Sequence, residues 1–263
     1  MMNETIKVDV DARGIVQLRL SRPGKRNALS AQMIAELTAF AEVASKRRDW
    51  RAVILAGEGD AFCAGGDLDW MRQQMAADRQ SRMAEARKLA GMLGALNALS
   101  QPLIGAVHGS AFGGGVGLAC VCDLVLATPE TLFGLTETRL GLIPATIGPY
   151  VLARLGEGRA RRIFMSGKRF KAVEAMELGI VARLVDGDGL MAEAVREAEQ
   201  YLAAAPGAVA AAKALARSLS RSLDPARIEE SIIALADTWE QEEAREGVAA
   251  FFEKRKPSWD RTG

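Results

Sequence analysis

Histidine and cysteine are scarce in this chain of 263 residues, which contains one histidine and three cysteines. A site built from two imidazole ligands is therefore excluded, and we expect no bound metal, because a structural zinc site needs more of these ligands. Three cysteines cannot form a disulfide framework. We therefore expect the protein to work in a reducing compartment, the cytoplasm.

An excess of charge of one sign is also lacking, with 34 Lys and Arg against 33 Asp and Glu. Such a chain has no overall field that would attract a phosphate backbone, so we expect no nucleic-acid partner. The first ten residues are too polar for a signal peptide. Residues 89–122 carry no Asp, Glu, Lys or Arg. Because Pro102 and the triplet Gly113–Gly115 interrupt this run, we expect buried strand and loop rather than a membrane span.

Apolar segments alternate with helical patterns along most of the chain. Strands are expected at 16–20, 52–56, 103–107, 124–127 and 132–135, and helices from Ser30 to near Arg48, from about Asp67, and at 114–122, 172–178, 190–205, 208–218 and 226–239. Strands that are apolar throughout favour a parallel sheet buried on both faces. We expect an α/β core over residues 1–200 and a helical region over residues 201–263.

Glycines gather in two short windows, with four at 57–66 and six at 105–117. Each window follows an expected buried strand and precedes an expected helix, so free backbone N–H groups at a helix start could bind an anion. The alternative is a pair of tight turns. The glycine spacing matches neither a phosphate-binding loop, nor a dinucleotide fingerprint, nor a nucleophile elbow. An oxyanion that develops on a carbonyl group is compatible with both windows.

Side chains with catalytic chemistry are few. His108 follows a buried strand, where a hydrogen-bonded structural role is the commoner one. Cys120 and Cys122 are interpreted as buried structural thiols, and Cys63 lies in the first glycine window. Glu137 lies in the mostly apolar stretch 133–144. It is either a desolvated carboxyl suited to proton transfer or a carboxylate paired with Arg139 or exposed to solvent.

Four segments together resemble the enoyl-CoA hydratase/isomerase (crotonase) family. They are Arg22-Pro23 with Asn27-Ala28-Leu29, Ala61 to Leu68, His108 to Gly115, and Cys122-Asp123. Their order agrees with the family over about residues 20–260. The resemblance implies a spiral of repeated ββα units with a helical C-terminal trimerisation region, assembled as a homotrimer or a dimer of trimers. It also implies an acyl-CoA thioester substrate, with coenzyme A part of the substrate and no separate cofactor.

The resemblance also assigns site residues. The N–H groups of Gly66 and Gly114 would form the oxyanion hole, and Glu137 would be the catalytic acid and base. Two-carboxylate hydratases of the family carry a first glutamate where this chain has Gly117, so the usual pair of carboxylates is incomplete. The remaining substrate-binding and CoA-binding positions implied are Lys25, Arg26, Ala28, Ala64, Asp67, Leu68, Phe252 and Lys254.

A narrower resemblance links three segments to bacterial methylglutaconyl-CoA hydratases, which also carry glycine at this point. The segments are Asp69 to Met71, Ala111 to Leu118 and Thr136 to Ile147. The run Lys254-Arg255-Lys256 is either a solvated face or, as the resemblance implies, an approach to the CoA nucleotide, often across a subunit boundary.

Three functions follow from these patterns. The leading hypothesis is an acyl-CoA lyase that adds water across the C2–C3 double bond of an enoyl-CoA, with a branched or carboxylated acyl group. The second is a Δ3,Δ2-enoyl-CoA isomerase in which one glutamate moves the proton. The third is a non-catalytic acyl-CoA-binding homologue.

Overall fold

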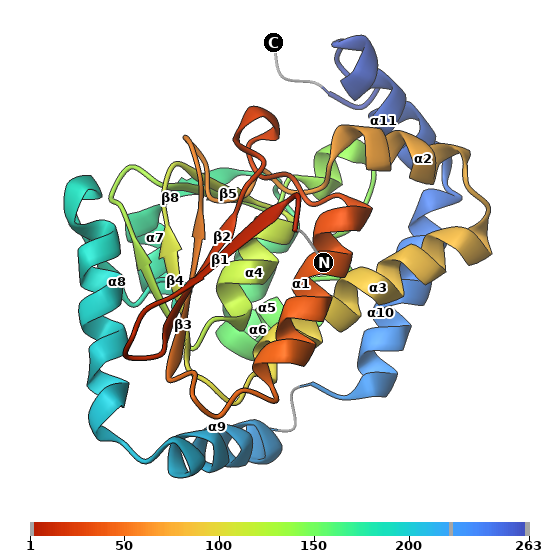
Figure 1. Cartoon of the computed structure of the whole chain (residues 1–263). Coiled ribbons are helices and arrows are strands. Elements are labelled where there is room, and N and C mark those ends of the chain that lie inside the picture. The colour runs from red at the N-terminus through yellow and green to blue at the C-terminus, as the bar shows by residue number, and fades with distance from the viewer. Residues whose placement is uncertain (1–2, 221–222, 261–263) are drawn as a thin grey trace.

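The molecule was analysed as a computed structural model that describes residues 3–220 and 223–260 (Figure 1). A six-stranded sheet forms the centre of the fold. Its strands in spatial order are β1 (Ile6–Val10), β2 (Ile15–Leu20), β3 (Ala52–Gly57), β4 (Leu103–Val107), β6 (Leu124–Ala127) and β9 (Arg183–Leu184). The β1–β2 pair is antiparallel and the other pairs of this sheet are parallel. The prediction of a mainly parallel sheet is confirmed.

A second sheet has three strands. It contains β5 (Ser110–Phe112), β7 (Leu132–Gly134) and β8 (Arg169–Lys171), in that order. The segment 108–113 was expected to be loop, and the strand β5 within it corrects that expectation. Three residues are too few to show the alternation of a strand, and β5 exists because its backbone pairs with β7.

Helices cover both faces of the large sheet. They are α1 (Ala31–Ala44), α2 (Leu68–Ala76), α3 (Arg79–Asn97), α4 (Gly114–Val121), α5 (Gly148–Leu155), α6 (Glu157–Phe164), α7 (Ala172–Leu178), α8 (Leu190–Glu199), α9 (Pro206–Ser220), α10 (Pro225–Trp239) and α11 (Glu242–Glu253). Single 3₁₀ turns are η1 (Pro23–Lys25), η2 (Glu137–Leu140), η3 (Gly187–Gly189) and η4 (Gln200–Ala203). Figure 1 shows α8 against one face of the sheet, with α1, α3 and α4 on the opposite side.

The core follows from these two layers. On one face Ile54, Ile104 and Leu126 pack with Ala194 and Ala198 of α8. On the other face a larger cluster joins the sheet to α1, α3 and α4. Because each central strand contributes apolar side chains to both faces, its sequence reads as a continuous apolar run rather than an alternating one.

Three helix predictions need correction. Helix α1 starts after Ser30, whose hydroxyl accepts a hydrogen bond from the Met33 N–H at 3.2 Å as expected, but it ends at Ala44. Residues 45–49 are exposed, so no burial stabilises a further turn. Residues 89–97 are the end of α3 rather than strand or loop. The helix expected at 190–205 ends at Glu199 and continues as η4. Helix α11 lies within the region expected to be helical, but the sequence did not delimit a helix there.

The residues after Gln200 form helices and no strand within the described part of the chain. Helix α10 packs along α3, and α11 packs on the turn η2. The division into a core over 1–200 and a C-terminal oligomerisation region over 201–263 stays a prediction. No helix in the described ranges is long and apolar enough to cross a bilayer.

Asn27 fixes the loop before α1 against the first glycine window. Its buried side-chain amide donates to the Glu58 and Ala61 carbonyl oxygens at 2.8 and 2.7 Å, and its Oδ1 accepts from the Arg22 N–H at 2.8 Å. Its φ of 54° lies in the left-handed region, which asparagine tolerates better than most residues. One side chain therefore sets the spacing of two loops.

We expect Asn27→Ala to lower the free energy of unfolding by about 3 kcal/mol, because it leaves buried partners unpaired and strains the backbone. Urea denaturation of both proteins measures the difference. Asn97→Ala is the control: its side chain hydrogen-bonds to none of the described residues, so its effect should stay within about 0.5 kcal/mol. Equal effects of the two substitutions would contradict the role given to Asn27.

Candidate active site

One large cavity, of about 740 Å³, opens between the two glycine windows, the turn η2 and the helices α3 and α10. It gathers most of the site residues expected from the sequence. Those that line it are Lys25, Arg26, Ala28, Ala64, Gly66, Asp67, Leu68, Gly114 and Glu137. Phe252 and Lys254 are outside its lining.

The first glycine window presents the Gly66 N–H to this cavity. On either side of Gly66, the Leu29 N–H donates to the Gly65 oxygen at 2.7 Å and the Asp67 N–H donates to the Leu29 oxygen at 2.9 Å. The Gly66 N–H itself donates to no backbone oxygen of the described residues. Because the C=O and the N–H of one trans peptide point in opposite directions and the Gly65 C=O points to Leu29, the Gly66 N–H faces away from Leu29 and is free to bind an anion.

Asp67 holds that window in place rather than offering its carboxylate to a ligand. One oxygen caps α2 by accepting from the Asp69 N–H at 2.8 Å, and the other pairs with Arg22 at 2.8 Å. Burial acts to raise the pKa of the Asp67 carboxyl. The Arg22 guanidinium and the N–H groups of Asp69 and Trp70 outweigh it and hold that pKa below its ordinary value.

The second window places Gly114 at the first position of α4, where N–H groups have no acceptor within the helix. A Cβ at Gly114 would lie 2.5 Å from Leu29 Cδ1, and one at Gly115 would lie 2.5 Å from the Cys63 carbonyl oxygen. Because the Cys63 oxygen is a backbone atom that cannot rotate aside, the glycine at position 115 is what lets the start of α4 come this close to the first window. The positive end of the helix dipole therefore points into the cavity.

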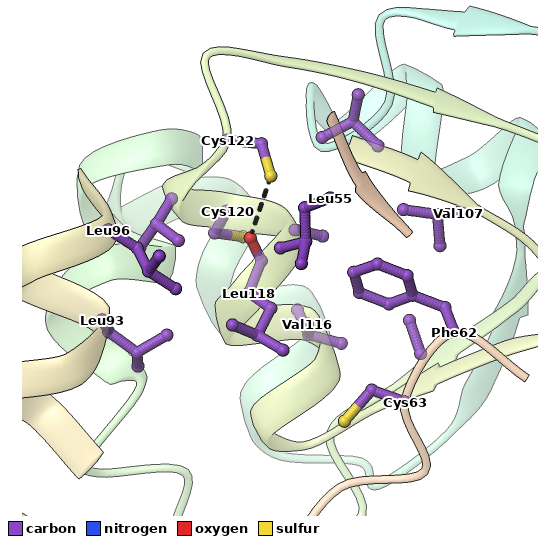
Figure 2. Close-up of a cluster of buried hydrophobic side chains, with 14 of the residues drawn as sticks. Leu55, Phe62, Cys63, Leu93, Leu96, Val107, Val116, Leu118, Cys120 and Cys122 are labelled. Atoms are coloured by element: carbon purple, nitrogen blue, oxygen red, sulfur yellow. Dashed lines mark hydrogen bonds between the residues drawn. The ribbon is translucent and has the colours of Figure 1, made fainter. Parts of the chain in front are cut away.

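Backbone hydrogen bonds join the two windows. The Cys63 N–H donates to the Ser110 oxygen and the Phe112 N–H donates to the Cys63 oxygen, each at 3.0 Å. Figure 2 shows Phe62 and Cys63 beside Val116 of α4. The two N–H donors are thereby fixed on one wall of one cavity.

Glu137 is the first residue of η2, and its carboxyl group is desolvated. Its Oε2 is buried and has no hydrogen-bond partner among the described residues. Its Oε1 lies 3.0 Å from the point where a Cβ of Gly113 would be, so it reaches the start of α4. Burial raises the pKa of this carboxyl from 4.5 to about 7.

The alternative of an ion pair with Arg139 is not realised. Arg139 is exposed, and its side chain lies against Gly167. Of the three environments that the sequence left open for Glu137, the structure has the desolvated one. A carboxyl with a pKa near neutrality can both accept and return a proton at physiological pH.

The other reactive side chains are structural. His108 Nε2 is 2.8 Å from the Gly59 oxygen, which confirms the hydrogen-bonded interpretation. Cys63, Cys120 and Cys122 are buried, and burial raises the pKa of each thiol to about 12. Figure 2 shows the Cys122 thiol donating to the Leu118 oxygen. At neutral pH these thiols are protonated, as the structural interpretation of Cys120 and Cys122 requires.

Gly117 is buried in α4, directly behind Ile147. A Cβ there would lie 2.8 Å from Ile147 Cγ2 and 3.4 Å from Leu93 Cδ1. Ile147 lines the cavity, whereas Gly117 does not. The space into which a side chain at position 117 would extend is therefore filled by hydrocarbon.

The C-terminal helices complete the cavity, which the sequence did not indicate. Apolar residues of α3 and α10 form one wall, with Phe251 of α11 nearby: Met83, Ala86, Leu89, Ile232, Leu235, Ala236 and Trp239. Helical spacing of apolar residues in 226–239 was visible, but that spacing does not reveal what the face covers.

The basic run at 254–256 lies beyond this wall. Lys254 ends α11 in a left-handed conformation and is exposed, while Arg255 forms ion pairs with Glu246 and Glu253. Phe251 rather than Phe252 lines the cavity. A CoA-binding role for Phe252 and Lys254 stays a prediction. No group of three or more His, Cys, Asp or Glu within the described ranges could hold a metal ion.

The fold and the cavity define a class of protein: an α/β protein that holds two backbone donors and one desolvated carboxyl in the lining of one cavity. Comparison with known proteins gives the family. The chain matches the enoyl-CoA hydratase/isomerase family over residues 11–262. It therefore belongs to that family, as the sequence motifs predicted.

Individual relatives agree over almost the full length. The mevalonyl-coenzyme A hydratase sidH of Aspergillus fumigatus is 35% identical over 252 residues, covering 93% of this chain and 91% of that protein. The crystal structure of an enoyl-CoA hydratase from Shewanella pealeana is 35% identical, with a TM-score of 0.80 and coverage of 98% of this chain and 96% of that one. One from Mycobacterium avium is 30% identical, with a TM-score of 0.87 and coverage of 98% and 100%. These neighbours confirm the crotonase fold.

The buried carboxyl of Glu137 predicts a pH dependence of stability. Because its pKa is 4.5 in the unfolded chain and about 7 in the fold, the native state holds a proton that the unfolded state releases between these values. This group therefore makes the protein less stable as pH rises through that window. Since Gln does not titrate, we expect Glu137→Gln to be more stable than the wild type by about 3 kcal/mol at pH 8 and nearly equal to it at pH 4.

Urea denaturation at several pH values, at matched protein concentration, measures this difference. The control is Glu177→Gln, which replaces an exposed glutamate of α7. It should leave the pH profile unchanged. A Glu137→Gln profile parallel to that of the wild type would contradict a desolvated carboxyl.

Proposed function

We propose that this protein adds water across the C2–C3 double bond of an enoyl-CoA thioester. The observation that carries the proposal is the meeting of three groups at one cavity: the free Gly66 and Gly114 N–H groups and the unpaired, buried Glu137 carboxyl. Donors arranged in this way stabilise an oxyanion, and a carboxyl beside them moves protons at the neighbouring carbon atoms. Relatives named as enoyl-CoA hydratases support the same chemistry.

The proposed reaction has two proton transfers. The thioester oxygen accepts hydrogen bonds from Gly66 and Gly114. The Glu137 carboxylate takes a proton from water as the hydroxyl adds to C3, and the electrons of the double bond move into the enolate held by the two donors. The protonated Glu137 then returns its proton to C2. Loss of one such donor typically costs about 10²- to 10³-fold in rate.

Substrate recognition is proposed on the same cavity. Lys25 and Arg26 are positively charged residues in its lining that could meet the phosphates of CoA, with Ala28, Ala64 and Leu68 beside them. We propose a branched or carboxylated acyl group of the methylglutaconyl type, from the motifs shared with those hydratases. Assembly as a homotrimer or a dimer of trimers and a cytoplasmic location remain proposals from the same resemblance.

The second candidate is isomerisation between 3-enoyl and 2-enoyl thioesters. Ile147 favours it, because the space beside Gly117 holds hydrocarbon where two-carboxylate hydratases hold an acid. One carboxyl suffices to move a proton between C4 and C2. Mass spectrometry of products from 2-enoyl and 3-enoyl substrates separates the two reactions, since only hydration adds the mass of water. Isomerisation without any hydration would overturn the leading proposal.

Glu137→Gln should reduce turnover of the enoyl-CoA substrate by about 10²- to 10⁴-fold, because the amide cannot accept the proton of water. Binding of CoA thioesters should change little, since both backbone donors remain. Steady-state kinetics and calorimetric titration with acetyl-CoA measure the two effects, with Glu177→Gln as the exposed control. Full activity of Glu137→Gln would remove the residue from the reaction. CoA-ester binding by a wild type without turnover would instead indicate the non-catalytic alternative.

Gly117→Glu alone should not yield a two-carboxylate site. Because its Cβ would overlap Ile147 Cγ2, we expect this variant to lose about 2 kcal/mol of stability. Adding Ile147→Ala should relieve the overlap, so the double variant should be more stable than the sum of the single effects by at least about 1 kcal/mol. Faster crotonyl-CoA hydration by the double variant than by Ile147→Ala would show that the cavity accepts a second acid. Additive stability effects would contradict the contact.

A further inference from the structure

We propose that the C-terminal helix α11 is a positioning element for the catalytic turn η2, and that Gly247 is its positioning residue. The proposal rests on the proposed function in one respect, the role of Glu137. It concerns a residue far in the sequence from Gly66, Gly114 and Glu137, on a helix whose bounds the sequence did not predict.

The two elements meet backbone to backbone. A Cβ at Gly247 would lie 2.5 Å from the Leu140 carbonyl carbon and 2.6 Å from its oxygen. On the other side of the contact, a Cβ at Gly141, which follows η2, would lie 2.3 Å from the carbonyl oxygen of Glu243 in α11. Backbone atoms cannot rotate aside as the end of a side chain can, so any side chain at Gly247 must push the two elements apart.

A shift at this contact passes directly to Glu137. The turn η2 runs from Glu137 to Leu140, and Gly141 ends it with a φ of 68°. The Leu142 N–H donates back to the Glu137 oxygen at 3.0 Å, and the Gly141 N–H donates to the Thr138 oxygen at 3.3 Å. Because these bonds close the turn on itself, its two ends move together.

Helix α11 is also attached to the donor side of the cavity. The Arg72 guanidinium of α2 lies 4.5 Å from the ring centre of Phe252. Met71 of α2 packs against the buried cluster that Leu142 forms with Ala244 and Val248 of α11. Since α2 starts directly after Gly66 and Asp67, α11 contacts both the helix that follows the donor-bearing loop and the turn that supplies the carboxyl. Figure 1 shows α11 beside α2.

This arrangement lets α11 set how far Glu137 reaches toward the oxyanion donors. Catalytic groups that are displaced by about 1 Å commonly lose about 10²-fold in rate. Gly247 thus acts through Glu137, without contact with substrate. The buried state of Oε2 depends on the same placement, since a displaced turn would admit water to the carboxyl.

The test compares Gly247→Ala with Gly91→Ala. Both glycines lie inside helices, so both variants gain helix propensity, but a Cβ at Gly91 in α3 would meet nothing within 4 Å. For Gly247→Ala we expect the kcat of crotonyl-CoA hydration to fall about 10- to 100-fold, with acetyl-CoA affinity changed less than about threefold. Gly91→Ala should keep the wild-type kcat.

The pH profile separates positioning from a general loss of structure. The wild-type kcat should rise through the pKa of Glu137, about 7. In Gly247→Ala, water that reaches the carboxyl should lower that pKa, so the midpoint of the profile should move to lower pH. A kcat within about twofold of the wild type with an unmoved midpoint would overturn the proposal. If kcat, acetyl-CoA affinity and melting temperature all fall together in Gly247→Ala, the variant has lost structure in general and the proposal is likewise overturned.

Hydrogen exchange tests the same contact without turnover. The Leu142 amide should exchange faster in Gly247→Ala and at the wild-type rate in Gly91→Ala. If the wild type hydrates no enoyl-CoA, the proposed function fails and this exchange comparison alone decides the positioning role. If Gly247→Ala does not fold, Val248→Ala removes atoms from the same buried cluster without adding any. Unchanged kcat and unchanged Leu142 exchange in Val248→Ala would then overturn the proposal.

Discussion

The close backbone approach of two glycine windows is the constraint on which the rest of the site depends. The start of α4 lies so near the Cys63 backbone that Gly115 has no space for a Cβ. Hydrogen bonds from Cys63 and Phe112 keep the windows in register. Because the donors are backbone groups on rigid elements, their position is set by the fold before any ligand binds. Preorganised donors of this kind need no rearrangement when charge develops on a ligand.

The carboxyl of Glu137 complements these donors through its environment rather than through a partner. Its Oε2 has no hydrogen bond from the described residues, and burial brings its pKa to about 7. An unpaired buried carboxyl destabilises the fold once it is ionised, and groups held in this way are typical of functional sites. The hydrocarbon wall at Ile147 belongs to the same environment, because it keeps a second acid out of the site.

Local patterns predicted much of this arrangement. Ser30 signals the start of α1, apolar runs mark β3, β4 and β6, and the glycine windows mark the two loops that line the cavity. Strand β5 was missed because it is only three residues long. Helix α11 was not delimited within the region expected to be helical, because its few buried residues lie among charged ones. The environment of Glu137 was left open for a related reason. Whether a carboxyl is paired or desolvated depends on residues distant in the chain, and Arg139 is close in sequence without pairing with it.

The sequence by itself determined the α/β class and the family, because these follow from residue type and motif spacing, which are local properties. Gly66, Gly114 and Glu137 were assigned as site residues by the resemblance to that family, and their roles in a reaction stay a proposal. The tertiary structure decided how these groups are arranged. Ile147 fills the space beside Gly117, and α10 supplies a wall of the cavity. Gly247 of α11 lies in close backbone contact with the turn that carries Glu137. Each of these contacts joins segments far apart in the chain, and no local pattern encodes which of them will meet.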